Sequence, residues 1–262
     1  MGTLHTRGFT IVETMLFLGI SGLLIVAMLA GTGASINIQR YRDAVETFKT
    51  TLQSQYGELT SVQNDRGNTW SCNAQAQSQT GGDEIRGQSD CVLLGRYVTV
   101  VDNTISISSV LGRPATVVET TGSDIAKLLS NYTLNISTVV EDTTVLEWDT
   151  RIAWATSGSE MRSPTSPRSL AILFIRSPDS GQIYTFTSDT VPSEPTPQSL
   201  SAMLVAAQTI PGQQQRTICI DSNGLFVTSE SSIFINSAAT GPSSIETRSN
   251  DYIRSIGGDT QC

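Results

Sequence analysis

The sequence is poor in lysine and histidine. The first shortage argues against nucleic-acid binding and the second against catalysis that depends on histidine. It has two lysines in 262 residues, no dense run of basic residues and a net charge of −8, so charge alone does not predict a face that binds nucleic acid. The only histidine, His5, lies close to the N-terminus, which leaves no Ser–His–Asp or Cys–His pair in the body of the chain. We also find no H-E-x-x-H, P-loop or G-x-S-x-G motif. We therefore expect no catalytic residues, no metal, no cofactor and no enzymatic activity.

Cysteine is also scarce, and the four cysteines form no C-x-x-C pair. A zinc site built from cysteine and histidine is therefore not expected. An even number of cysteines behind an N-terminal apolar segment favours disulfides in an oxidising compartment. Of the three possible connectivities we favour Cys72–Cys91 with Cys219–Cys262, because each bridge then closes a loop within its own half of the chain. Free buried thiols are the alternative.

One long apolar run, Phe9 to Ala30, dominates the N-terminus. As a helix its 22 residues would be roughly 33 Å long, enough to cross a hydrocarbon core. A secretory signal peptide has its cleavage site after the apolar part. Here the plausible site, between Gly8 and Phe9, comes before it. Cleavage there would leave the membrane helix on the mature protein.

The stretch "RGFTIVE", Arg7 to Glu13, resembles the class III signal of type IV prepilins and of the pseudopilins of type II secretion. In that family a prepilin peptidase in the membrane cuts after the glycine, the new N-terminal phenylalanine is N-methylated, and the fifth mature residue is glutamate. The matching positions are Gly8, Phe9 and Glu13. The resemblance implies a leader at 1–8, a transmembrane and filament-core helix at 9–30, and other pilin subunits, prepilin peptidase and the membrane as partners.

Glu13 is the residue that a simple membrane anchor does not explain. A carboxylate buried in lipid is costly unless it is paired. Cleavage would create an amine at Phe9, and the amine of a neighbouring subunit could pair with Glu13 inside a helix bundle. At about 4 Å and an effective dielectric near 20, this attraction is of order 4 kcal/mol before desolvation costs. The alternative is a glutamate tolerated near the helix end by snorkelling or water.

An amphipathic helix is expected at 31–63. Apolar residues recur there at steps of three to five and predict a stripe that seats on a sheet; they are Ile36, Tyr41, Val45, Phe48, Leu52, Tyr56, Leu59 and Val62. Together with 9–30 this makes one long helix, with two helices hinged at Gly31–Gly33 as the alternative. Many major pilins carry a proline near the end of the apolar run, whereas the first proline here is Pro114. This difference favours a minor pilin.

The remaining residues, 64–262, predict a β-rich head. The expected fold is α+β, with a long N-terminal helical spike packed on antiparallel sheets. Strands are expected at 92–101, 103–111, 133–140, 144–150, 170–176, 182–188 and 231–236, with a hairpin over 216–229 that turns at Gly224. Short helices are expected at 123–132, capped by Ser123 or Asp124, and at 197–208. Surface loops rich in proline, serine and threonine are expected at 163–168 and 192–198.

The tail "TICIDSNGLF", from Thr217 to Phe226, gives a second and weaker resemblance, to minor pseudopilins of the GspH/FimT family. Their heads are sandwiches of antiparallel sheets that rest on the spike helix. Within it, the segment from Asp221 to Gly224 is similar to the start of a calcium loop, but the later ligands are missing, so we interpret it as a turn. Asn131 and Asn135 begin glycosylation sequons that fall beside or within a predicted strand.

Together these features predict a structural subunit, held in the cytoplasmic membrane by one helix with its head outside and then built into a cell-surface filament. The alternatives are a filament-displayed adhesin or a DNA-uptake receptor. DNA is possible as a partner but not favoured, because acidic residues surround Arg216, Arg248 and Arg254. A type II secretion pseudopilin and an anchored exoenzyme are further alternatives.

Overall fold

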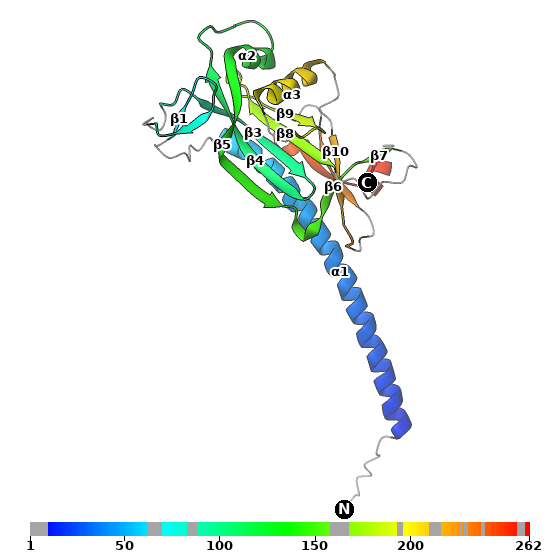
Figure 1. Ribbon diagram of the computed structural model, residues 1–262. Helices are drawn as coiled ribbons and strands as arrows, with labels where there is room; N and C mark the ends of the chain where they lie inside the picture. Colours follow the sequence, from blue (N-terminus) through cyan, green and yellow to red (C-terminus); the bar gives the residue numbers. More distant parts are fainter. Residues whose placement is uncertain are drawn as a thin grey trace, which may run out of the picture.

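A single helix of 50 residues, α1 (Ile11–Thr60), forms the axis of the molecule. We describe a computed structural model, which covers residues 10–61, 70–82, 88–157, 168–192, 196–209, 216–225, 227, 230–236, 239–255 and 260–262. At 1.5 Å per residue α1 is about 75 Å long. It is continuous through Gly31 and Gly33, so the hinged alternative is wrong. Its N-terminal half projects from the head and its C-terminal half is embedded in it (Figure 1).

The embedded half of α1 uses the apolar stripe that the sequence predicts. Its first buried residue is Tyr41, which is 2% exposed, whereas Ile36, five residues earlier, is 46% exposed. From Tyr41 onward one face is buried; its residues are Tyr41, Ala44, Val45, Phe48, Leu52, Gln55, Tyr56 and Leu59. Val62, the last residue of the expected stripe, lies outside the described residues.

The larger sheet has five antiparallel strands in the order β5-β4-β3-β8-β9. Their bounds are β3 Val92–Val101, β4 Thr104–Pro114, β5 Tyr132–Val145, β8 Ser169–Arg176 and β9 Ile183–Ser188. Four of them agree closely with the predicted strands. The loop between β8 and β9 is a tight turn, in which Gly181 adopts a φ of +72° and its N–H donates to the carbonyl of Ser177.

The prediction of separate strands at 133–140 and 144–150 was wrong. Residues 132–145 form the single strand β5, and the strand ends where Glu147–Asp149 turn sharply. The acidic pair Glu141–Asp142 lies within β5, which is an edge strand of its sheet, and edge strands commonly carry charged residues.

The smaller sheet has four antiparallel strands in the order β12-β11-β10-β6. Their bounds are β6 Arg151–Ala153, β10 Arg216–Asp221, β11 Ser231–Ile235 and β12 Ile245–Ser249. The predicted hairpin over 216–229 is not formed by the described residues, because β10 pairs with β11 and with β6. Leu225 and Val227 lie outside strands and pack instead against the core, which explains their apolar character.

Two cores hold these layers together. The first lies between α1 and the sheets, and it combines Phe48 and Leu52 with strand residues such as Ile172 and Ile220. The second covers the other face of the larger sheet with two helices, α2 (Asp124–Asn131) and α3 (Pro197–Thr209). Ser123 caps α2 by accepting a hydrogen bond from the N–H of Ala126. The fold is thus the expected α+β arrangement of a helix packed on a head of antiparallel sheets.

Two disulfides pin short peripheral elements to the head. Cys72–Cys91 ties the hairpin of β1 (Trp70–Cys72) and β2 (Ser78–Thr80) to the start of β3, and Cys219–Cys262 ties the C-terminal residue to β10. These are the two pairs that the sequence analysis favoured. The C-terminal region also contains η2 (Pro242–Ser244), α4 (Asn250–Ser255) and β13 (Thr260–Gln261), which pairs with β7 (Thr156–Ser157).

Arg168 corrects another expectation, because it was assigned to a surface loop and is only 3% exposed. Its guanidinium donates to Asp189 at 2.7 Å and to the carbonyl of Thr217 at 2.7 Å. Asp189 also pairs with Arg216 on β10 at 2.9 Å. The buried charge is therefore paired and links the two sheets. Residues 163–167 of that loop lie outside the described residues.

Candidate functional site

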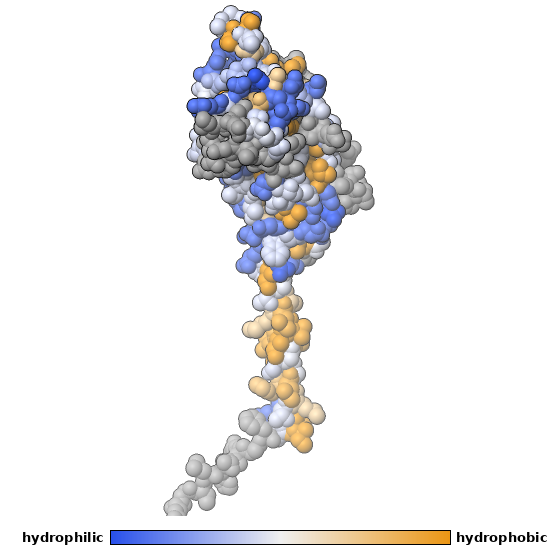
Figure 2. All heavy atoms as spheres, turned by 60° about the vertical axis from the view of Figure 1, so that its left-hand side comes forward, coloured by the Kyte–Doolittle hydropathy of each residue, from blue (hydrophilic) through white to orange (hydrophobic). Residues whose placement is uncertain are grey.

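The projecting half of α1 is the most unusual surface of the described chain. It is apolar and long enough to cross a membrane, and none of its most apolar 18-residue window is buried. Figure 2 displays this half as a hydrophobic rod below a largely hydrophilic head. Large side chains such as Ile11, Phe17, Leu23 and Met28 are each more than two-thirds exposed. In water this surface would be strongly unfavourable, so it indicates an apolar environment, which suggests membrane anchoring.

Three threonine hydroxyls at the two ends of this rod form hydrogen bonds within the helix itself. Thr14 donates to the carbonyl of Ile11 at 2.9 Å, and Thr32 donates to the carbonyl of Leu29 at 3.0 Å. Thr10 is the N-cap residue and accepts a hydrogen bond from the N–H of Glu13. Such internal bonds lower the cost of placing these hydroxyls in lipid or in a helix bundle.

Glu13 occupies the third position of α1, in its first turn. A carboxylate in the first turn interacts favourably with the positive end of the helix dipole. The sequence Thr10-x-x-Glu13 also has the spacing of a capping box, of which the Thr10 half is present. The sequence analysis missed this local role, although the spacing was readable. Gly8 and Phe9, the other two residues of the signal, lie outside the described residues.

Glycines in the rod make no contact that would require them in a single molecule. A Cβ added at Gly19, Gly22, Gly31 or Gly33 would meet nothing within 4 Å. Small residues on an apolar helix allow a second helix to approach closely. No contact within the described chain therefore requires a glycine at these four positions.

The junction between rod and head contains a stacked pair from distant parts of the chain. The guanidinium of Arg40 lies over the ring of Trp148, 4.6 Å from its centroid. Trp148 lies in the sharp turn after β5, where both Trp148 and Asp149 have positive φ angles of 57° and 58°. The indole is 47% exposed and its flanking residues Glu147 and Asp149 are also exposed, whereas Leu146 and Thr150, two residues away on either side, are buried.

The polar groups that the sequence offered as binding sites have structural partners. Asp221 accepts a hydrogen bond from the N–H of Asn223, whose φ is 43°, so this segment forms a turn. Asn131 and Asn135 are buried, and both side-chain amides donate to backbone carbonyls within the head. No group of three metal-ligating side chains is present among the described residues.

The three C-terminal arginines do not form a free basic patch. Arg216 pairs with Asp189, Arg248 with Glu246 and Arg254 with Asp251. Arg248 also lies over the ring of Phe234, 3.3 Å from its centroid. Their charges are therefore largely compensated within the head.

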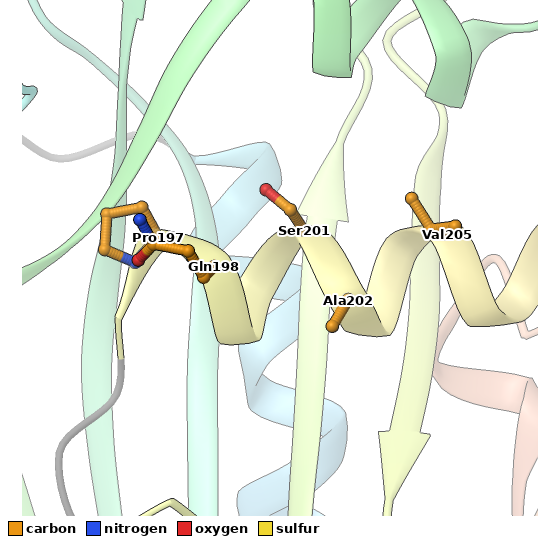
Figure 3. Close-up of a pocket in the computed structure, with 5 residues that line it drawn as sticks. All are labelled: Pro197, Gln198, Ser201, Ala202 and Val205. Atoms are coloured by element: carbon orange, nitrogen blue, oxygen red, sulfur yellow. The ribbon is translucent and has the colours of Figure 1, made fainter.

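A groove runs along the outer side of α3 and is lined by Pro197, Gln198, Ser201, Ala202 and Val205 (Figure 3). Its lining carries one hydroxyl, one amide and no charged side chain, so these residues offer no acid, base or nucleophile with an activating partner.

No protein-family model matches this sequence, no curated protein matches it, and no solved structure matches it. The long apolar helix on a β-rich head is compatible with a pilin-like architecture.

Proposed function

We propose that this protein is a structural subunit, of the minor-pilin kind, in a type IV pilus or related filament. The observation that carries the proposal is α1 itself, whose C-terminal half is the core of the head while its N-terminal half is a fully exposed apolar rod. A plain membrane anchor needs no rigid continuity with the head. A subunit that packs its helices side by side into a filament does, because the helix then fixes where each head sits.

The motif around Gly8 and Phe9 supports two successive environments for this rod, first the membrane and then the filament. The precursor is held in the membrane by the helix, a prepilin peptidase removes residues 1–8, and Phe9 becomes the methylated N-terminus. The rod then leaves lipid for a bundle of identical helices. Both environments are apolar, so the transfer exposes no new apolar area to water.

Within this proposal, Glu13 pairs with the Phe9 amine of a neighbouring subunit. Among the described residues Glu13 has no ion-pair partner in its own chain. Removing one partner from a buried pair costs several kcal/mol, roughly 3–5. Such a pair would set the axial register between subunits.

Mass spectrometry of the N-terminal peptide of the native protein tests the processing step. We expect a peptide that begins at Phe9 and carries one methyl group. An intact leader, or a mature N-terminus beyond Ala30, would contradict the proposal, because either result leaves no methylated amine next to the helix.

A further inference from the structure

The C-terminal end of the strand β5 is exposed on both faces and has β4 as its strand neighbour on one side only. Residues 142–145 are all exposed, and the side chain of Val145 is 59% exposed. β5 is the last strand of the larger sheet and runs along the margin of the head (Figure 1). Residues 142–145 are named here the open edge. An exposed sheet edge is a template on which another chain can add a strand.

The register of β4 and β5 shows which peptide groups of the open edge point outward. Next to the open edge, the N–H of Leu146 donates to the carbonyl of Asn103 at 2.7 Å. Hydrogen-bonded and non-hydrogen-bonded pairs alternate along an antiparallel ladder. Thr144 therefore bonds to β4, whereas the N–H and C=O groups of Thr143 and Val145 point away from β4. These outward groups can bond to a further strand.

Other sheet edges of the head are covered by the chain itself. Gln53 on α1 donates to the carbonyl of Ile245 on β12 at 3.1 Å, and the N–H of Arg168 donates to the carbonyl of Ile152 on β6 at 3.2 Å. The first half of β5 lies beside the β1–β2 hairpin, and Asn135 donates to the loop of that hairpin at 3.0 Å. No such bond covers the open edge within the described part of the chain.

Negative charge is in excess around the open edge. Asp142 forms no ion pair with the residues that the structure describes. The strand and the turn after it contain four acidic residues, Glu141, Asp142, Glu147 and Asp149. Two arginines contact the same region, but Arg151 pairs with Asp102 at 3.3 Å and Arg40 lies over Trp148. The open edge is therefore complementary to a partner with positive charge.

We propose that the open edge receives an extended segment of a partner protein, in which lysine or arginine alternates with β-branched residues. The main chain of the segment bonds to the outward groups of Thr143 and Val145, as in β-strand addition. Its cations lie across from Asp142, and its apolar side chains cover the exposed side chain of Val145. This inference concerns the head alone and does not depend on the proposed filament function.

A second copy of this chain fits the open edge less well. Pairing two open edges would bring Glu141 and Asp142 of both copies into neighbouring strands, and each copy has a net charge of −8. Charged residues on an exposed edge commonly prevent pairing between identical strands. The same charges attract a basic segment, so the acidic pair discriminates between the two occupants.

The test uses the full-length protein in a nonionic detergent and a fluorescein-labelled peptide as the probe. The peptide, Lys-Val-Lys-Val-Thr-Val, has the chemistry of the proposed segment, and fluorescence anisotropy measures its binding. In one control peptide glutamate replaces both lysines, and in the other every peptide nitrogen is methylated, which removes the donors of a β-ladder. We expect saturable binding of the basic peptide and at least about tenfold weaker binding of both controls.

Substitutions of Thr143 locate the binding on the protein. Thr143→Pro removes an N–H that points away from β4, so the fold loses no ladder bond, and proline is tolerated at such edge positions. The variant should bind the basic peptide at least about tenfold less well, because this N–H no longer donates to the added strand. Thr143→Ala is the matched variant that keeps the N–H. It should bind within about threefold of the unaltered chain, because strand addition gains affinity mainly from main-chain bonds.

Four results would overturn the inference: no saturable binding of the basic peptide, or equal binding of the acidic peptide, of the methylated peptide or by folded Thr143→Pro. Melting temperatures show whether the variants fold. If Thr143→Pro does not fold, the two basic peptides, methylated and not, still decide the question on the unaltered chain. A cross-linked dimer that Thr143→Pro abolishes would identify a second copy as the occupant and would also overturn the inference. None of these results bears on the N-terminal processing that tests the filament function.

Discussion

The hydroxyl of Tyr41 accepts a hydrogen bond of 2.7 Å from the backbone N–H of Ser231, 190 residues away. The same hydroxyl donates to the carbonyl of Ile220 at 2.8 Å. One side chain of α1 therefore joins the end of β10 to the start of β11. It does so at the first buried turn of the helix, where the rod becomes part of the head.

This contact predicts a clear cost for Tyr41→Phe. The ring can still pack, but the N–H of Ser231 loses this partner in a partly buried environment, so the free energy of unfolding should fall by about 1–3 kcal/mol. Urea unfolding of the full chain in detergent measures it. Tyr252→Phe is the control, because that ring is half exposed, and a loss there equal to the loss at Tyr41 would contradict the assigned role.

The buried side chains of two tyrosines predict that the folded head loses stability at alkaline pH. Burial raises the pKa of Tyr56 and of Tyr97 to about 12, from 10.0. Because the folded state holds these protons more tightly, their contribution to stability is complete below pH 10 and is lost as the pH rises towards 12. Absorbance at 295 nm should detect two tyrosines that ionise only as the head unfolds. A Tyr56→Phe, Tyr97→Phe double variant should lose this coupled step, and its persistence would contradict the assignment.

The hydrogen bonds of Asp124 predict that the folded head loses stability at acid pH. A hydrogen bond from Ser180 is the main cause that lowers the pKa of this carboxyl, and a bond from Tyr184 adds to it. The carboxylate ties α2 to the β8–β9 turn, so its contribution is present above the unfolded pKa and is lost as the pH falls through the folded value. Asp124→Asn should lower the melting temperature at neutral pH. The difference from the unaltered chain should disappear in acid, and a constant difference would be the contrary result.

Glu13 variants separate membrane insertion from assembly. Glu13→Ala should insert normally, because removing a charge favours lipid, but it should be impaired in filament incorporation, because the Phe9 amine of the neighbour loses its partner. Glu13→Gln is the matched variant that keeps the size of the side chain without its charge. Fractionation of membranes and sheared filaments measures both steps. Unimpaired incorporation of both variants would contradict the pairing.

The sequence predicted those helices and strands in which buried apolar residues recur at regular intervals. The stripe from Tyr41 to Leu59 and the alternation in β3 and β4 each bury one face. The partner of β10 was mispredicted because Leu225 and Val227 look like a strand but pack as loop residues. The left-handed turn at Trp148 and the buried Arg168 depend on contacts with distant segments, α1 and β10 respectively. No local pattern reports such contacts, so both were visible only in the structure.

The most direct test of the central claim is to shear the cells that make this protein and to examine the released material by electron microscopy with an antibody against the head. The account predicts that the chain pellets at high speed and labels filaments, and that Glu13→Ala removes the label from them while the chain stays in the membrane. A native chain that remains wholly in the membrane fraction, under conditions in which the cells carry filaments, would contradict it.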